Sequence, residues 1–226
     1  MSDRVELDTV ALPQVSNVRQ CPLTTNAGST DVSVPTPTNL NELFTLYTVH
    51  GQRKYGEGVN ALEHALQCAA LAFNDGAPQE LIAAALFHDV GWFLTDGGNS
   101  DDVVPVSEDH AAWGARILSP LFGPEVAQPV ALHVLAKRWR CTIDLDYYDE
   151  LSEASQITFV AQGGPLNTDE RARFEAHPGF NAAMALRTWD DRAKTPGLDV
   201  PLLEEYRSLA RLVATSWSLG RSNVPG

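Results

Sequence analysis

An all-α fold is predicted for this chain of 226 residues, from three observations on its sequence. Apolar residues recur at helical spacing through most of the chain after residue 38. Capping residues and prolines stand where several of these apolar segments begin. Strict apolar–polar alternation, which would favour strands, does not run over any useful length. A chain of this length can bury one full-sized core, so we expect a single helical domain.

Residues 1–38 are expected to form an N-terminal extension, because four prolines and a loop-like composition interrupt them. The extension would lie on the surface or against a partner subunit. The helical domain would then span residues 39–226. Its helices are expected, in order, at 39–50, 59–74, 78–94, 107–118, 124–139, 151–161, 167–176, 180–194 and 201–219.

Local signals justify these elements along the chain. Asn39 or Asn41 can cap the first helix, and the second is amphipathic and closes at Asp75-Gly76. Pro78 suits a helix start, and the segment after it has the apolar density of a central, buried helix.

The later elements have comparable signals. A polar loop at 95–105 precedes the fourth helix, and 144–149 is expected to be a tyrosine-bearing connection. Asn167 with Glu170 forms a plausible capping box for the short helix that follows.

Charge and composition exclude several partners. The chain has 16 Lys+Arg against 29 Asp+Glu, a formal charge of -13, so its surface should repel nucleic acid and anionic membranes. An anionic small molecule would need a local basic cluster. Neither a signal peptide nor a membrane span is recognisable. Three widely spaced cysteines are expected to be reduced thiols without function, which favours a cytoplasmic location.

Two adjacent ionisable residues, His88 and Asp89, interrupt the apolar run at 81–92. Burying either group without a partner costs several kcal/mol. A metal ion removes this cost, because the imidazole supplies a nitrogen ligand and the carboxylate can place one oxygen on each of two ions.

Other candidate ligands stand on inward faces of the expected helices. They are His64, His110, His133 and Asp190. A single inward histidine is more often a hydrogen-bonded core residue than a ligand. Helix bundles, however, build metal sites from inward side chains of facing helices, and these residues follow one another on successive helices. His50 and His177 are not interpreted as ligands.

The order His…His-Asp…His…His…Asp resembles the HD-domain superfamily over roughly residues 50–195. The resemblance implies a helical bundle with a two-metal site in its core, in which Asp89 bridges the ions. It implies His64, His88 and Asp190 on the first metal, and His110 and His133 on the second. Asp191 competes with Asp190. Asp190 is preferred because Arg187 and Lys194 then keep the family's flanking spacing.

Most HD-domain proteins are metal-dependent phosphohydrolases, whereas a smaller branch resembles myo-inositol oxygenase and the phosphonate-cleaving oxygenases. That branch uses a mixed-valent pair of iron ions and O2. Tyr55-Gly-Glu57 followed by His64 is similar to its opening motif, in which the tyrosine can ligate iron and the glutamate sits beside the substrate amine. Tyr55 stands one residue nearer to Glu57 than that pattern has it. Both could also be ordinary loop residues.

The resemblance also assigns substrate contacts. Lys137, Ser155 and Arg187 fall where the family binds the phosphonate, and their chemistry suits a dianion. Each alone would also fit an exposed or ion-paired helix position. Trp92 replaces a histidine found in relatives that take a primary amine, and an indole face attracts a quaternary ammonium. Trp92 could equally be a core filler.

The function implied is O2-dependent C–P cleavage of 1-hydroxy-2-(trimethylamino)ethylphosphonate, giving phosphate and glycine betaine. Asp89, Tyr55 and Glu57 would be the catalytic residues. The same chemistry on 1-hydroxy-2-aminoethylphosphonate, giving glycine, is an alternative. A phosphohydrolase acting on nucleotides or phosphate esters, or a binding module without activity, also stays open. So does a homodimer.

Overall fold

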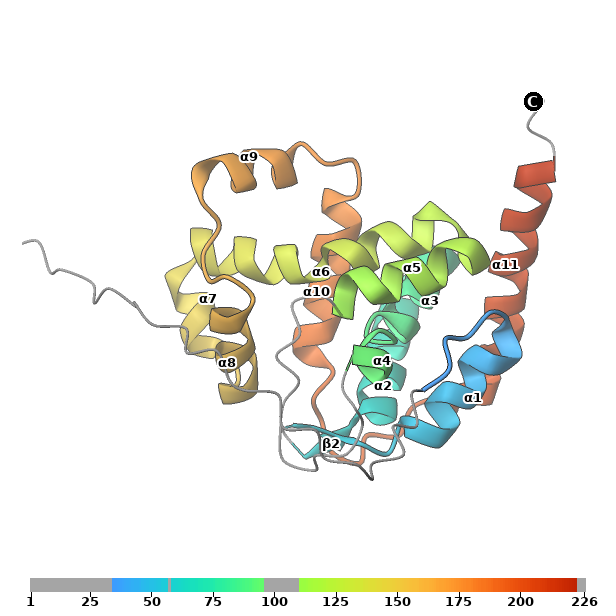
Figure 1. The fold of residues 1–226 in the computed structure, drawn as a ribbon. Helices are drawn as coiled ribbons and strands as arrows, with labels where there is room; N and C mark the ends of the chain where they lie inside the picture. Colours follow the sequence, from blue (N-terminus) through green and yellow to red (C-terminus); the bar gives the residue numbers. More distant parts are fainter. Residues whose placement is uncertain (1–33, 57, 96–109, 223–226) are drawn as a thin grey trace, which may run out of the picture. The chain divides into compact units, whose positions relative to one another are not determined.

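The part of the chain that the structure describes is helical almost throughout in a computed structural model (Figure 1), so the all-α prediction is confirmed. The described residues are 34–56, 58–95 and 110–222. The helices are α1 (Leu40–His50), α2 (Ala61–Asn74), α3 (Gln79–Phe87), α4 (Trp92–Thr95), α5 (His110–Phe122), α6 (Pro124–Ile143), α7 (Leu145–Glu150), α8 (Glu153–Ala161), α9 (Thr168–Glu175), α10 (Phe180–Arg192) and α11 (Arg207–Ser222). A short antiparallel hairpin, β1 (Lys54–Gly56) and β2 (Val59–Asn60), precedes α2, and a 3-10 turn, η1 (Leu203–Tyr206), precedes α11.

Asparagine side chains begin three of these helices. Asn39 accepts a hydrogen bond from the backbone N–H of Glu42, which satisfies a donor that the first turn leaves open. Asn60 and Asn167 each form a capping box with the glutamate three residues later. The helix starts predicted at Asn39 and Asn167 are therefore correct.

The central helix is α3, and every residue of it from 82 to 87 is buried. It packs against α2, α6, α10 and α11, while α5 and α6 lie against each other (Figure 1). Phe87 contributes ring contacts to Phe44, Tyr47 and Phe122, which joins α1 and α5 to the centre. This arrangement brings the inner faces of α2, α5, α6 and α10 around the C-terminal end of α3.

The single helix predicted for 78–94 is wrong. The α-helix ends at Phe87, and four residues in turns separate it from the one-turn α4. Hydrogen bonds to the third residue back, from Val90 to Phe87 and from Trp92 to Asp89, replace the α-helical pattern there. Gly91 allows the start of α5 to come close, because a Cβ atom at this position would lie 2.0 Å from the carbonyl oxygen of His110.

The predicted connection at 144–149 is also wrong, since it forms α7. Asp144 begins this helix by accepting a hydrogen bond from the backbone N–H of Tyr147. Residues 107–109 of the predicted fourth helix, and nearly all of the proposed extension, lie outside the described residues. Among the described helices, none is both long enough and apolar enough to cross a bilayer.

Candidate metal centre

Six side chains from five segments converge beside the end of α3. They are His64 on α2, His88 and Asp89 after α3, His110 at the start of α5, His133 on α6 and Asp190 on α10. The turn that interrupts the apolar run at 88–91 lets both His88 and Asp89 face this point. A continuous helix would have directed neighbouring side chains about 100° apart.

Asp89 lies between two groups of imidazoles. Its Oδ2 atom is 3.2 Å from His88 Nε2 and 4.0 Å from His64 Nε2. Its Oδ1 atom is 3.5 Å from His110 Nε2 and 3.7 Å from His133 Nε2. One carboxylate therefore presents an oxygen to each of two sets of donors, which is the arrangement that a bridge between two cations requires.

Asp190 completes the first of these sets. His64 Nε2 lies 3.3 Å from both His88 Nε2 and Asp190 Oδ1. Asp191 does not face the imidazoles: its carboxylate pairs with Arg187 and accepts a hydrogen bond of 2.6 Å from the Tyr147 hydroxyl. Of the two neighbouring aspartates, only Asp190 is placed to contact a shared cation.

Backbone carbonyls orient three of the imidazoles. A carbonyl can only accept, so the Nδ1 atom of each ring carries the proton and the Nε2 atom faces the cluster. The carbonyls belong to Ala193 for His64 (2.8 Å), Ala85 for His88 (2.9 Å) and Val130 for His133 (2.7 Å). Nε2 lone pairs turned toward one another and toward carboxylates are the donor chemistry of a metal site.

The charges of the cluster call for cations. Burial raises the pKa of Asp89, but His88 outweighs this and holds it well below its usual range. Burial lowers the pKa of His88, yet the charge of Asp89 raises it overall to about 9. In the absence of a metal ion, the His88 ring is therefore the positively charged imidazolium. Burial and the neighbouring His110 lower the pKa of His133 to about 3, which leaves that ring neutral. These residues fit two metal ions.

Tyr55 covers the first set of donors. Its hydroxyl donates a hydrogen bond of 2.6 Å to Asp89 Oδ2, and its ring stacks on His64 with centroids 4.0 Å apart. Burial and then the charge of Asp89 raise the pKa of Tyr55 well above its usual value. The buried Cys68 thiol lies 3.6 Å from His64 Nε2, and burial raises its pKa as well. The sequence alone gave Cys68 no role.

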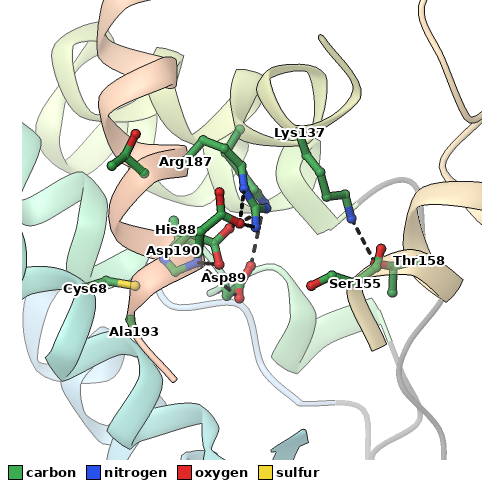
Figure 2. Close-up of polar contacts among 12 residues, drawn as sticks. Cys68, His88, Asp89, Lys137, Ser155, Thr158, Arg187, Asp190 and Ala193 are labelled. Carbon is green, nitrogen blue, oxygen red and sulfur yellow. Dashed lines mark hydrogen bonds and ion pairs between the residues drawn. The ribbon is translucent and has the colours of Figure 1, made fainter. Parts of the chain in front are cut away.

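A pocket of about 680 Å³, counted with the part open to solvent, leads from the surface to the cluster. Tyr55 and Trp92 line one part of it, and Lys137, Ser155 and Arg187 line another, so the structure brings all five together. Figure 2 shows Arg187 beside Asp190, and the Lys137 ammonium directed toward Thr158. Glu57, which the sequence placed at the substrate amine, lies outside the described residues.

The basic side chains of the pocket have defined partners. The Lys137 ammonium donates to Thr158 Oγ1 at 2.8 Å (Figure 2), and burial followed by the charge of Arg187 lowers its pKa to about 7. Arg187 Nη1 lies 2.8 Å from Asp190 Oδ2. Lys194 donates to Ser155 Oγ at 3.2 Å.

Sequence reasoning missed three polar lining residues. Thr158 on α8 and Gln162, the C-cap of this helix, line the pocket three and seven residues after Ser155. Lys194, noted only for its spacing, lines it from the segment after α10. The helical period counted from Ser155 is the signal that would have found Thr158 and Gln162.

Comparisons with known proteins agree with this geometry. A family model described as "HD domain" matches residues 60–162. The chain is 46% identical over 171 residues to a hydroxymethylphosphonate dioxygenase of Gimesia maris, covering 75% of this chain and 85% of the relative. It is 36% identical over 161 residues to a 1-hydroxy-2-(trimethylamino)ethylphosphonate dioxygenase (glycine-betaine-forming) of Leisingera caerulea, covering 69% and 80%. An uncharacterised protein of Acanthamoeba polyphaga mimivirus is 31% identical over 174 residues, covering 76% and 80%.

The family model that matches the centre of the chain and the two relatives named as phosphonate dioxygenases confirm the resemblance inferred from the histidine and aspartate pattern. The matched range begins one residue before α2 and ends just after α8. The chain belongs to the HD-domain family, within its phosphonate-oxygenase branch, and is an oxidoreductase.

Proposed function

We propose that this protein binds two iron ions through the six converging side chains and cleaves the C–P bond of a small 1-hydroxyphosphonate with O2. The position of Asp89, with one oxygen toward each set of histidines, is the observation that carries the proposal. The iron pair, when bound, supplies the activation of O2. The conversion R–CH(OH)–PO₃²⁻ + O₂ → RCOO⁻ + HPO₄²⁻ + H⁺ balances without another reductant.

The two sets of donors divide the proposed ligands. His64, His88 and Asp190 hold the first ion and His110 and His133 the second, with Asp89 shared. Nitrogen and oxygen donors of this kind also accept Mn, Co or Zn. Iron is preferred because the named relatives are dioxygenases.

The pocket side chains bind the phosphonate group. Lys137 supplies an ammonium that becomes fully charged when the dianion arrives, since its pKa in the empty pocket is only about 7. Arg187 lines the pocket with Nη1 on Asp190 and with Nε and Nη2 on Asp191, so it contributes its positive charge to the phosphonate site. Ser155 and Lys194 lie together and add a hydroxyl and a second ammonium. This cluster offsets the acidic surface at the one place where an anion must bind.

Tyr55 covers the first set of donors before substrate binds. Its hydroxyl occupies the space beside Asp89 Oδ2, where a substrate hydroxyl would reach the first ion. We assign Tyr55 as the group that the substrate hydroxyl displaces. The stacking on His64 keeps the ring close, so that the hydroxyl can return to Asp89 after product leaves.

Hydroxymethylphosphonate, with hydrogen as the R group and formate as the carboxylate, is our first substrate. The relative that carries this name is 46% identical, against 36% for the trimethylamino enzyme. The described pocket wall is also rich in cations, which a substrate without an ammonium group suits best. One observation favours 1-hydroxy-2-(trimethylamino)ethylphosphonate as a second candidate: Trp92 lines the pocket, edge to face with Tyr55. The primary amine analogue ranks third.

The test is phosphate release by iron-loaded protein with and without O2. We expect release from hydroxymethylphosphonate only in the presence of O2, with one formate formed per phosphate. Release of phosphate from nucleotides or phosphate esters without O2, after loading with Mn or Co, would instead identify a phosphohydrolase. The absence of both activities would favour a binding module.

A matched pair of variants tests the ligand assignment. Asp190→Asn should lower the iron content, because it removes an oxygen donor next to His64. Asp191→Asn changes the neighbouring residue in the same way but faces Arg187 and Tyr147, so two ions per chain should remain. Equal loss of iron in the two variants would contradict the assignment.

A further inference from the structure

A buried glutamine on α2 is hydrogen-bonded to the segment that follows α10. Gln67 is 1% exposed, and its side-chain amide makes two hydrogen bonds to the backbone of Thr195. Its Nε2 donates to the Thr195 carbonyl at 2.7 Å, and its Oε1 accepts from the Thr195 N–H at 3.0 Å. The amide therefore pairs with both backbone groups of one residue, as a donor to its carbonyl and as an acceptor from its N–H.

The segment held in this way carries two groups of the proposed site. The carbonyl of Ala193, which lies where α10 ends beside the cluster (Figure 2), accepts the Nδ1 proton of His64 at 2.8 Å. Lys194, between Ala193 and Thr195, reaches Ser155 on the pocket wall. A shift of this short segment would turn the imidazole of His64 and displace the ammonium of Lys194.

No regular backbone pattern holds this segment. The α-helix stops at Arg192, and Ala193 has φ −84° and ψ 55°, outside the helical region. The N–H of Ala193 still bonds to the Trp189 carbonyl, and the N–H of Lys194 bonds to the Arg192 carbonyl at 3.0 Å, so α10 holds the first two residues and Gln67 holds the third, Thr195. Gln67 stands three residues after His64 on the same face of α2, and thus links the ligand to the segment that orients it.

We infer that Gln67 is a positioning residue for the first metal and for the pocket ammonium. It acts through the segment 193–195 and touches neither metal ligand nor substrate itself. The inference rests on the proposed function, because it assigns His64 to a metal ion. Groups that orient a ligating histidine in this way typically change metal affinity by about 10- to 100-fold when they are removed.

The experiment compares Gln67→Met with Asp75→Asn in titrations with Co2+, followed by visible absorption. Asp75, the C-cap of α2, makes another polar link to α10, through Trp189 Nε1 at 2.8 Å and Arg192 Nη1 at 3.3 Å, and lies away from the cluster. We expect the Met variant to weaken one of two Co2+ sites by about 10- to 100-fold and to leave the other within about twofold. Asp75→Asn should leave both sites unchanged.

A third variant separates positioning from simple packing. In Gln67→Glu, an ionised carboxylate cannot donate to the Thr195 carbonyl, whereas a protonated one restores both hydrogen bonds. Its Co2+ affinity relative to the parent at the same pH should therefore recover as the pH falls, while that of Gln67→Met stays constant relative to the parent.

Two results would overturn the inference: a Met variant that binds Co2+ like Asp75→Asn, or a Glu variant whose relative affinity does not depend on pH. A parent protein that binds a single Co2+ would instead contradict the proposed function. The two failures are thus distinguishable in one titration.

Discussion

Lys137 is expected to lower the stability of the protein without metal and substrate, although it binds the phosphonate in the proposed reaction. It is 4% exposed, and burial together with Arg187 lowers its pKa from 10.5 to about 7. One pKa unit corresponds to about 1.4 kcal/mol, so a charged ammonium here costs up to about 5 kcal/mol. The hydrogen bond to Thr158 offsets about 1–3 kcal/mol of this. Lys137→Met should therefore raise the free energy of unfolding of the metal-free protein by about 2–4 kcal/mol below pH 7.

This gain should depend on pH in a defined direction. Below about pH 7, Lys137 is protonated in both the folded and the unfolded state, so the cost of burying the charge is fully present. Between about pH 7 and 10.5, Lys137 is protonated in the unfolded chain but neutral in the folded protein, so the stability of the parent rises with pH. The stability gained by Lys137→Met therefore disappears over this range.

Urea unfolding at the two ends of this pH range measures the effect. Lys54→Met, which removes an exposed lysine, is the control and should change the stability little at either pH. Under turnover, Lys137→Met should lower kcat/KM for the phosphonate by about 10- to 100-fold, the value of a charged hydrogen bond. A variant that is less stable than the parent below pH 7, or equally changed at both ends, would refute the reasoning.

Three other predictions follow from the same contacts. Gly91→Ala should lower the free energy of unfolding, measured by thermal unfolding, by on the order of 3 kcal/mol and should lower the metal content, because its Cβ would meet the His110 carbonyl. Gly220→Ala, where the new Cβ has no atom within 4 Å, is the control. The same loss of stability and metal in both variants would contradict the prediction. Trp92→His should lower kcat/KM for the trimethylamino substrate more than for hydroxymethylphosphonate, and an unchanged ratio would remove Trp92 from substrate choice. At alkaline pH, methylphosphonate binding should take up close to one proton, measured by calorimetry in buffers of different ionisation enthalpy, and none in Lys137→Met.

The helical architecture could be predicted from the sequence because apolar period and caps are local signals. Asn39 and Asn167 begin helices where the sequence placed them. The interruption after Phe87 could not be predicted in this way, since apolar residues resume at Val90 directly after His88 and Asp89, and the close approach of α5 at Gly91 is a tertiary contact. The helix at 145–150 was missed because its tyrosines and acidic residues lack an apolar period.

The sequence predicted the residues of the candidate site more completely than the boundaries of the helices around it. The order of histidines and aspartates indicated the residues that the structure brings together, and spacing favoured Asp190 over Asp191, which the contacts of the two carboxylates support. Gln67 was missed because its hydrogen-bond partners, the backbone N–H and C=O of Thr195, are far away in the chain. Such pairings depend on the packing of helices and leave no pattern in one sequence.

The bridging role of Asp89 is the central claim, and anomalous diffraction at the iron edge from iron-soaked crystals tests it most directly. We predict two peaks, one beside His64, His88 and Asp190 and the other beside His110 and His133, with an oxygen of Asp89 on each. A single peak at full iron occupancy, or two peaks of which one lacks Asp89, would contradict the account.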